Sequence, residues 1–339
     1  MGDTLDRSEN QTVNRSKMTK PLPSVPHPKP KRLPERRAVT IVAGVRSLSG
    51  IVLCADTQET VSQLSKRHVP KLRFEPTISG INLVNKPEHL AAAFCGAGDG
   101  PWIDKLVDEC WKHAKGATSL GDACSKIEDA IKNLYAEFGA IFQPGFCPTA
   151  ELIYGVKMHG NSRLFSASGP IVTEQEQYAS AGCGYYMADF LKTRMHHNFL
   201  TIYQCTILAA YILFQAKEHV DGCGGDSHIA VLRNRATSGR VPWRKIQAIT
   251  DLLKESDGLT GLMILKAADF SIETEELKKE LESLLSTMQF LRDRHHDNLK
   301  QLEATWVGAE KALSGAGQKY DSLGLPVLAE ESSERPGSN

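Results

Sequence analysis

The sequence lacks the features that would place it in several large classes of protein. Its 339 residues contain 40 Lys plus Arg and 40 Asp plus Glu, so no charge excess points to nucleic acid or an anionic surface. No apolar stretch approaches the roughly 20 residues that a membrane-spanning helix needs. The N-terminus lacks the apolar core of a secretory signal. We therefore expect no nucleic acid, no membrane and a cytoplasmic location, with KPKR at 29–32 as a weaker indication of the nucleus.

Patterns typical of metal and cofactor sites are also scarce. The eight cysteines are scattered without a CxxC pair, which favours reduced thiols. There is no HExxH motif, and the histidine pairs at 196–197 and 295–296 would each diverge by about 100° on a helix. The acidic turn DGCGGD at 221–226 is more simply a tight turn than a cation site. We predict no metal and no cofactor.

The two ends of the chain are poor in apolar residues. Residues 1–39 are polar and then proline-rich and basic, which predicts a disordered leader or propeptide. Residues 315–339 read as a second disordered tail. Between them we expect one domain over 40–268 and a long helix within 269–314.

The order of the expected elements between the two ends indicates the fold class. Strand patterns occupy 40–46, 50–56, 68–74 and 90–95, and helices follow at 101–116 and 119–139. The second half repeats this order, with strands at 151–158, 162–167 and 171–179, helices at 183–196 and 200–220, and a strand at 228–234. Such an order is not that of a parallel doubly wound sheet. It predicts an α+β fold in which two sheets lie between two helical layers, a four-layer αββα sandwich with a C-terminal helical extension.

The C-terminal extension is expected to be helical. A helix over 243–256 is followed by an apolar run, and 272–313 reads as a long amphipathic helix. Its apolar positions alternate at four- and three-residue spacings: Leu277, Leu281, Leu284, Met288 and Leu291. This stripe is compatible with packing on its own domain or with a partner helix, and His295 continues it as a seam residue rather than a ligand.

A glycine loop, CGAGDG at 95–100, lies between a strand and a helix, as in a dinucleotide-binding turn. A dinucleotide-binding unit needs a parallel strand after that helix, whereas here a second helix follows. The nucleotide interpretation is therefore weak, but the amides of the loop remain candidates for binding another anion, such as a tetrahedral intermediate.

The stretch RRAVTIVAGVRSLSGIVLCADTQET at 36–60 reads as a β-hairpin that begins on Thr40 and ends its second strand on Asp56. It resembles the opening hairpin of proteasome β-type subunits and bacterial proteasome-like peptidases, which are N-terminal-nucleophile (Ntn) hydrolases. Further similar segments follow in order: RHVPKL, FCGAGDG, SAGCGYYMADFL and LTIYQCTILAAYILFQAKEHVDGCGGD. The resemblance covers about 40–234 and implies the αββα fold.

The resemblance also implies site residues. It makes Thr40 the nucleophile, Asp56 and Lys71 its charged partners, Gly96 the source of an oxyanion amide, and Asp221 a second functional aspartate. Thr60 would pair with the backbone of a peptide substrate, and Phe94 is a candidate for lining the substrate pocket. The family's assembly implies a homo- or hetero-oligomeric ring.

The chemistry expected of these residues follows from proton transfer. An N-terminal threonine carries its own base, because its α-amine can take the hydroxyl proton. An ammonium such as that of Lys71 would lower the pKa of both groups, and Asp56 would hold the ammonium in place. Thr40 is internal, so this base exists only after the bond from Val39 to Thr40 is cleaved.

Three positions depart from the family pattern. A glycine is expected before the nucleophile, but Val39 stands there and its branched side chain crowds a turn. Cys183 and Cys223 stand where the family has hydroxyls, and thiols are weak donors. We therefore carry two hypotheses: a threonine peptidase, which is favoured, and a catalytically inactive structural or regulatory protein. A non-proteolytic amidase or acyl transferase is a minor third.

Overall fold

The computed structural model describes most of the chain between the two predicted tails. The described residues are 40–62, 65–77, 83–84, 88–139, 141, 148, 150–195 and 200–315. The predicted leader, and all of the predicted tail except Gly315, lie outside them. Within this part the chain forms a mixed α and β fold with two large sheets, a two-stranded ribbon and six helices.

The first sheet is antiparallel and brings both halves of the chain together. Its strands lie in the order β11 (Tyr178–Ala181), β1 (Val42–Ser47), β2 (Gly50–Asp56), β12 (Ser227–Arg233), β13 (Ser238–Arg240) and β6 (Leu83–Val84). The predicted hairpin is thus confirmed as β1 and β2, with Val42 opposite Ala55. Its turn is tight because Gly50 has φ +153° and packs against the backbone of Leu232, where a Cβ would clash.

The second sheet is also antiparallel. Its order is β10 (Ile171–Gln175), β9 (Asn161–Ser168), β8 (Ala150–Met158), β7 (Ala91–Gly98) and β5 (Leu72–Glu75). A separate ribbon pairs β3 (Gln58–Ser62) with β4 (Ser65–His68). The expected strand at 68–74 is therefore wrong in detail: β4 ends at His68 and β5 begins at Leu72, which leaves Lys71 in the connection.

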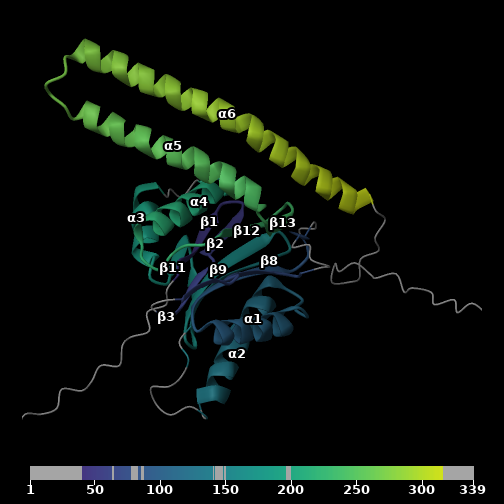
Figure 1. Ribbon diagram of the computed structural model, residues 1–339. Coiled ribbons are helices and arrows are strands. Elements are labelled where there is room, and N and C mark those ends of the chain that lie inside the picture. The colour runs from purple at the N-terminus through teal and green to yellow at the C-terminus, as the bar shows by residue number, and fades with distance from the viewer. Residues whose placement is uncertain are drawn as a thin grey trace, which may run out of the picture. The chain divides into compact units, whose positions relative to one another are not determined.

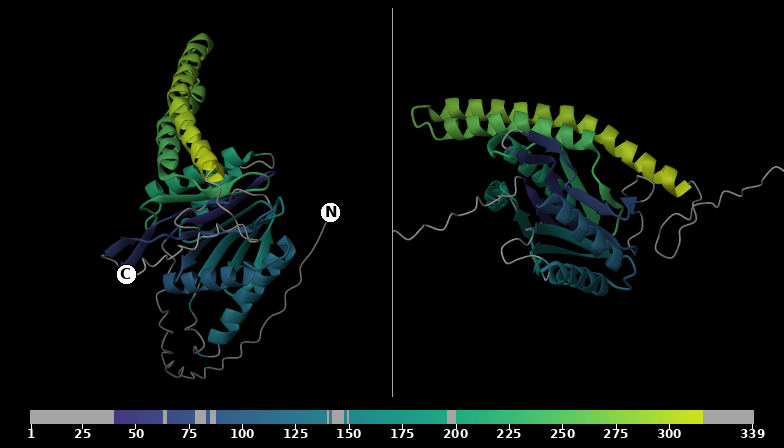
Figure 2. Two further views of the ribbon diagram at one scale, coloured as in Figure 1. Left: turned by 90° about the vertical axis from the view of Figure 1, so that its right-hand side faces the viewer. Right: turned by 60° about the horizontal axis from the view of Figure 1, so that its bottom comes forward.

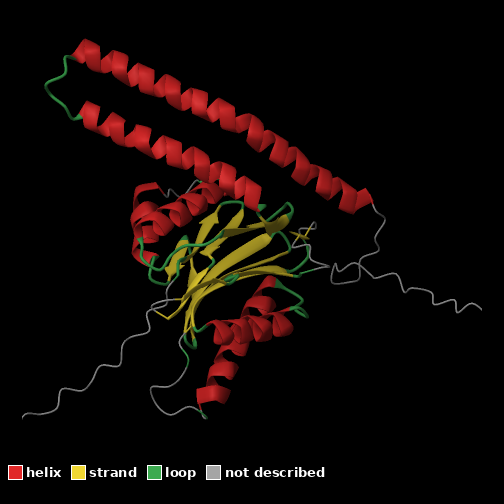
Figure 3. Cartoon of the chain, in the orientation of Figure 1, coloured by secondary structure: helices red, strands yellow, loops and turns green. Residues whose placement is uncertain are grey.

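Helices lie on the outer faces of both sheets, as Figures 1 and 3 show. The helices packed on the second sheet are α1 (Gly100–Ala114) and α2 (Leu120–Gly139), and those packed on the first are α3 (Tyr185–Met195) and α4 (Ile202–His219). Ser119 caps α2, since its hydroxyl accepts the Asp122 N–H at 3.1 Å. The Asp122 carboxylate binds the Thr118 N–H instead of completing a capping box on Ser119.

Three apolar clusters hold these elements together. One joins the first sheet to α3 and α4, and α4 is buried over most of its surface, as its apolar sequence predicts. A second joins the other sheet to α1 and α2. The third contains side chains from both sheets, including Leu53 from β2 and Ile153 from β8. Alternate residues of a strand thus serve different clusters, as the two-residue period requires.

The C-terminal extension is a pair of helices, α5 (Trp243–Ala267) and α6 (Thr274–Gly315). α5 is longer than the predicted helix, which ended at residue 256, because it continues through the apolar segment that follows. It contacts α4 and β12, and α6 runs back along α5 (Figure 2). Ion pairs join the two helices, from Lys266 to Glu280 at 2.8 Å and from Arg294 to Glu255. The predicted stripe is the less exposed face of α6, with Leu291 and His295 both buried, so packing on its own chain is the arrangement observed.

None of the helices in the described ranges is long and apolar enough to cross a membrane. The expected strand at 171–179 is two strands, β10 and β11, which belong to different sheets. The sequence also did not predict β3 or most of β4 in the ribbon. It did not predict β6 and β13 either, which are two and three residues long and lie at the edge of the first sheet. Strands this short carry too few side chains to produce a periodic pattern.

Candidate active site

Thr40 lies two residues before the start of β1, in a position fixed by the turn between β11 and α3. Its carbonyl accepts the N–H of Gly184 at 3.1 Å. Gly182 packs against the same carbonyl with φ +85°, and a Cβ there would overlap the Thr40 backbone. The Thr40 side chain is 2% exposed. The glycines of the SAGCG segment therefore hold the backbone of Thr40 in place.

Asp56 ends β2 and is fully buried beside Thr40. Its Oδ1 accepts the hydroxyl of Thr40 and the N–H of Ile41, the latter at 3.2 Å. Its Oδ2 accepts the N–H of Gly224 at 2.9 Å. A buried carboxylate is tolerated only when such donors replace water, so the strand end and the turn after α4 together hold this charge.

Lys71 completes a compact arrangement of the three predicted residues. Its Nζ lies 2.6 Å from Oγ1 of Thr40 and 2.9 Å from Oδ1 of Asp56, and it also donates to the carbonyl of Gln58. The Lys71 side chain is 11% exposed, so this ion pair is shielded from solvent. The structure thus brings Thr40, Asp56 and Lys71 together, although their order along the chain shows no such proximity.

This arrangement is suited to handling a proton on the Thr40 hydroxyl. The ammonium of Lys71 lies where it would stabilise negative charge on Oγ1, and Asp56 balances that ammonium in a site of low polarity. Neither residue is a free base, since each binds the other. With the peptide bond from Val39 to Thr40 intact, the nitrogen of Thr40 is an amide. Cleavage of that bond would make it an amine on the residue that carries the hydroxyl.

The oxyanion role predicted for Gly96 is not supported. Its N–H already donates to the carbonyl of Lys71 at 3.3 Å, as part of the pairing between β5 and β7. The side-chain direction of Gly96 faces α1, where a Cβ would lie 2.5 Å from Ile103. A sequence shows a glycine loop but not the hydrogen-bond partner of the loop's amide, because that partner depends on how the strands pair.

Phe94, predicted to line a substrate pocket, lies in the core of the described structure. Phe94 is fully buried, and its ring stacks on Tyr154 with the centroids 5.7 Å apart. It belongs to the cluster under α1 and α2, whereas its neighbours Ala93 and Cys95 face the first sheet. The strand period therefore turns this side chain into the core rather than toward a substrate.

The side chain of Asp221 is not among those that contact Thr40, Asp56 or Lys71 in the described residues. The side chain of Asp221 is exposed, and its backbone carbonyl lies 3.7 Å from the sulfur of Cys183. The turn that contains Asp221 reaches Asp56 through the N–H of Gly224, which was not among the residues predicted from the sequence. Thr60 lies on β3 opposite Lys66, but its side chain lies outside the described residues.

Cys183 and Cys223 meet beside Thr40. Their sulfurs are 3.8 Å apart, and that of Cys183 lies 3.4 Å from the Thr40 carbonyl. A hydrogen bond from Cys223, aided by the charge of Lys71, lowers the pKa of Cys183 to about 7. The same hydrogen bond and burial raise the pKa of Cys223. The sequence identified both positions, but only the fold shows that they are partners.

The glycine loop and the expected metal-poor character can also be compared with the structure. Asp99 caps α1 by accepting the N–H of Trp102 at 3.2 Å, and β7 pairs antiparallel with both neighbours, so the loop is not a dinucleotide-binding turn.

Among the described residues no group of three or more His, Cys, Asp or Glu side chains is placed to hold a metal ion. His295 faces Glu255, with the closest atoms 3.8 Å apart, and the pair at 196–197 lies outside the described residues.

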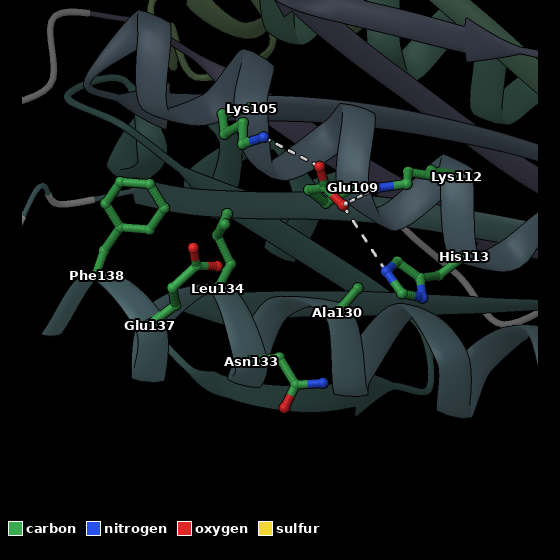
Figure 4. Close-up of a pocket in the computed structure, with 9 residues that line it drawn as sticks. All are labelled: Lys105, Glu109, Lys112, His113, Ala130, Asn133, Leu134, Glu137 and Phe138. Carbon is green, nitrogen blue, oxygen red and sulfur yellow. Dashed lines mark hydrogen bonds and ion pairs between the residues drawn. The ribbon is translucent and has the colours of Figure 1, made fainter. Parts of the chain in front are cut away.

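The surface recess drawn in Figure 4 lies between α1 and α2, away from Thr40. Its volume is about 310 Å³. Glu109 faces it and binds Lys105 at 3.0 Å and Lys112 at 3.1 Å, with His113 at 3.7 Å. These charges are mutually compensated, and the recess contains none of the residues predicted from the sequence.

Comparisons with known proteins identify a related fold. No protein-family model and no curated protein matches the chain. Among solved structures, Anbu (ancestral β-subunit) from Yersinia bercovieri has 13% sequence identity and a TM-score of 0.53, over 69% of this chain and 100% of that one. A Gly-1 mutant of Anbu from Hyphomicrobium sp. strain MC1 gives the same values. The helical assembly of the Anbu complex from Pseudomonas aeruginosa has 13% identity and a TM-score of 0.52, over 66% and 95% of the two chains.

These findings correct the resemblance drawn from the sequence. The assignment to the family of proteasome β-type subunits is wrong, because no family model matches and the structural neighbours are Anbu proteins. Glycine turns and strand ends recur wherever a fold recurs, so motifs of this kind report architecture more than family. What the chain shares with these Anbu structures, at 13% identity, is the fold.

Proposed function

We propose that this chain is the precursor of a hydrolase of peptide bonds whose nucleophile is Thr40, exposed by cleavage between Val39 and Thr40. The observation that carries the proposal is the buried contact of the Thr40 hydroxyl with both Lys71, at 2.6 Å, and Asp56. An ion pair costs free energy to bury, and this one surrounds the hydroxyl of a threonine. A purely structural role would be served as well by apolar side chains.

The proposed reaction follows from this geometry. The α-amine of processed Thr40 takes the proton from Oγ1, and the oxygen attacks the carbonyl carbon of the substrate. Lys71 stabilises the charge on Oγ1 before attack, while Asp56 holds the ammonium in place. The amine then protonates the leaving group, and water releases the acyl group from Oγ1 by the reverse steps. Because Gly96 donates to Lys71, the oxyanion donor is another group.

The alternative is a catalytically inactive protein that keeps the fold for structural or regulatory work. Specific observations favour it: the Gly96 amide is occupied, and Cys183 places a thiol against the Thr40 carbonyl where a hydroxyl would donate more strongly. Val39 at the cleavage position points the same way. Measurement of processing separates the two functions.

The layers of the fold, the assembly of the chain and its location are also inferred. We infer that the two sheets and the helices on their outer faces form the four αββα layers, within a domain spanning 40–268. We further infer assembly with other copies, in a ring or a helical array, since the Anbu complex of Pseudomonas aeruginosa forms a helical assembly. The helix over 272–313 is a second surface for such contacts. A cytoplasmic or nuclear location fits the predicted reduced thiols.

The test is the mature N-terminus together with hydrolysis. The full-length chain is produced, its intact mass measured, and its activity followed on a mixture of unstructured peptides. We expect loss of residues 1–39 and hydrolysis in the wild type and in Thr40→Ser, and neither in Thr40→Ala. Thr193→Ala, a threonine on α3 away from the site, serves as the matched control. A chain that still begins at Met1 or Gly2 and hydrolyses no peptide supports the inactive protein instead.

A further inference from the structure

Two thiols that the proposed hydrolysis does not use meet at the site. Cys183 lies in the turn between β11 and α3, and Cys223 lies in the turn between α4 and β12. Their sulfurs are 3.8 Å apart, although 40 positions separate them in the sequence. The approach is allowed by Gly184, where a Cβ would lie 3.0 Å from the sulfur of Cys223. The two turns therefore pack through their sulfur atoms.

The two sulfurs differ in access to solvent. Cys183 is half-buried, so small solutes reach it, whereas Cys223 is 6% exposed and lies behind it. The pair thus has an outer thiol that can react first and an inner thiol within reach to complete a second step.

The reactivity of the outer thiol is raised by its surroundings. The pKa of Cys183 is lowered to about 7 by the hydrogen bond from Cys223 and the charge of Lys71, which favours its thiolate relative to an ordinary cysteine. Burial raises the pKa of Cys54, Cys110 and Cys124 instead. Among the described cysteines, Cys183 therefore combines a thiolate, partial exposure and an adjacent thiol.

We propose that Cys183 and Cys223 are a redox-active pair which hydroperoxides convert reversibly to a disulfide. In the first step the thiolate of Cys183 attacks the terminal oxygen of the hydroperoxide; the O–O bond breaks, hydroxide or alkoxide leaves and takes a proton, and Cys183 becomes a sulfenic acid. In the second, the sulfur of Cys223 attacks that of Cys183, and the sulfenic oxygen leaves as water. Two electrons pass from the thiols to the peroxide, and a dithiol reductant returns them.

The disulfide would act on the neighbouring site, and this part rests on the proposed function. Bond formation brings the sulfurs from 3.8 Å to about 2.05 Å and removes the S–H that Cys183 donates to the Thr40 carbonyl. It also pulls on Cys223, whose neighbour Gly224 binds Asp56 through its N–H. Oxidation is therefore expected to lower hydrolysis at Thr40, and reduction to restore it.

The experiment uses the full-length chain treated with hydrogen peroxide, then alkylated and mapped by mass spectrometry. We expect a peptide pair joined through Cys183 and Cys223 that lacks two hydrogen atoms, and its disappearance after dithiothreitol. Cys223→Ser should instead stop at a Cys183 sulfenic acid, trapped by a dimedone probe. Cys124→Ser, which replaces a buried cysteine of α2, is the matched control and should form the same link.

Three outcomes would overturn the proposal: no reaction at Cys183, oxidation of Cys183 to sulfinic acid while Cys223 stays a thiol, or a link from Cys183 to Cys147. The mapping needs no hydrolytic activity, so its result stands whether or not Thr40 is processed. If the link forms and a previously active wild type keeps full activity, the pair is a redox site without control over Thr40, and that part of the proposal is wrong.

Discussion

The backbone N–H of Gly224 donates to Oδ2 of Asp56 at 2.9 Å and joins two segments that are 168 residues apart in the sequence. The other oxygen of Asp56 faces Thr40 and Lys71. Both oxygens of this buried carboxylate thus accept hydrogen bonds, on opposite sides. Asp56 links the first hairpin, the turn after α4 and the proposed nucleophile, so its substitution tests stability and chemistry together.

Asp56→Asn is predicted to lower both the stability of the fold and the rate of hydrolysis. An amide can turn its oxygen toward only one side, so its NH₂ group must face either Gly224 or the Thr40 and Lys71 donors. It also leaves the Lys71 ammonium without its counter-charge, and breaking a buried ion pair costs about 3–5 kcal/mol. Urea unfolding should register this loss in the free energy of unfolding, and hydrolysis should fall by roughly 100-fold or more.

The matched control is Asp251→Asn, on the exposed surface of α5, which should change the free energy of unfolding by less than about 0.5 kcal/mol. An Asp56→Asn chain as stable as this control would refute the view that Asp56 is a charged anchor of the fold. A folded Asp56→Asn chain with wild-type hydrolysis would remove it from the proposed mechanism.

Gly96→Ala tests the packing of β7 on α1 rather than catalysis. The added Cβ would lie 2.5 Å from the side chain of Ile103, and overpacking of this kind costs about 1–3 kcal/mol. The Gly96 N–H, which donates to Lys71, is retained. We expect destabilisation in urea unfolding that is partly relieved in the double variant with Ile103→Ala. Strictly additive free energies of unfolding for the two substitutions would contradict this contact.

Comparison of sequence and structure shows which kinds of inference succeed. The hairpin around Gly50, the cap at Ser119 and the helical stripe from Leu277 were predictable, since each depends on neighbours within a few residues. The meeting of Thr40 with Lys71 came from a resemblance, not from local pattern. The surroundings of Gly96 and Phe94 could not be predicted, because the pairing of β7 and the direction of its side chains depend on β5 and α1 rather than on β7 itself.

Short edge strands and the pairing of the two thiols could not be predicted from the sequence. β13 has three residues, too few for a period to be seen. Cys183 and Cys223 were noted as replacements for hydroxyls, but their 3.8 Å separation depends on two turns packing together. A single sequence carries no signal for such a contact, since the two positions are far apart along the chain and neither turn has a distinctive pattern of its own.

His228 is predicted to make the free energy of unfolding depend on pH. Burial, with a contribution from the nearby Arg240, lowers its pKa to about 4 in the folded chain, against an ordinary value near 6.5. Between these values the unfolded chain binds a proton that the folded chain excludes, so stability falls as pH is lowered from 6.5 to 4. The slope contributed is up to roughly 1.4 kcal/mol per pH unit. Urea unfolding across this range should show a smaller slope in His228→Gln, and an unchanged slope would contradict the assignment.

Leu291→Ala is predicted to loosen α6 while leaving the sheets intact. Leu291 is 8% exposed on the stripe that faces α5, whereas Leu285, on the same helix, is 52% exposed. Truncation of a buried leucine costs about 2 kcal/mol or more, and alanine is as good a helix former, so the loss reflects packing. Amide hydrogen exchange should become faster along α5 and α6 but not in β1, β2 or β8. Leu285→Ala, with the same change of side chain, should leave exchange near wild type. Equal effects of the two substitutions would mean that α6 does not pack on α5 through this stripe, and would restore the alternative that it serves a partner helix.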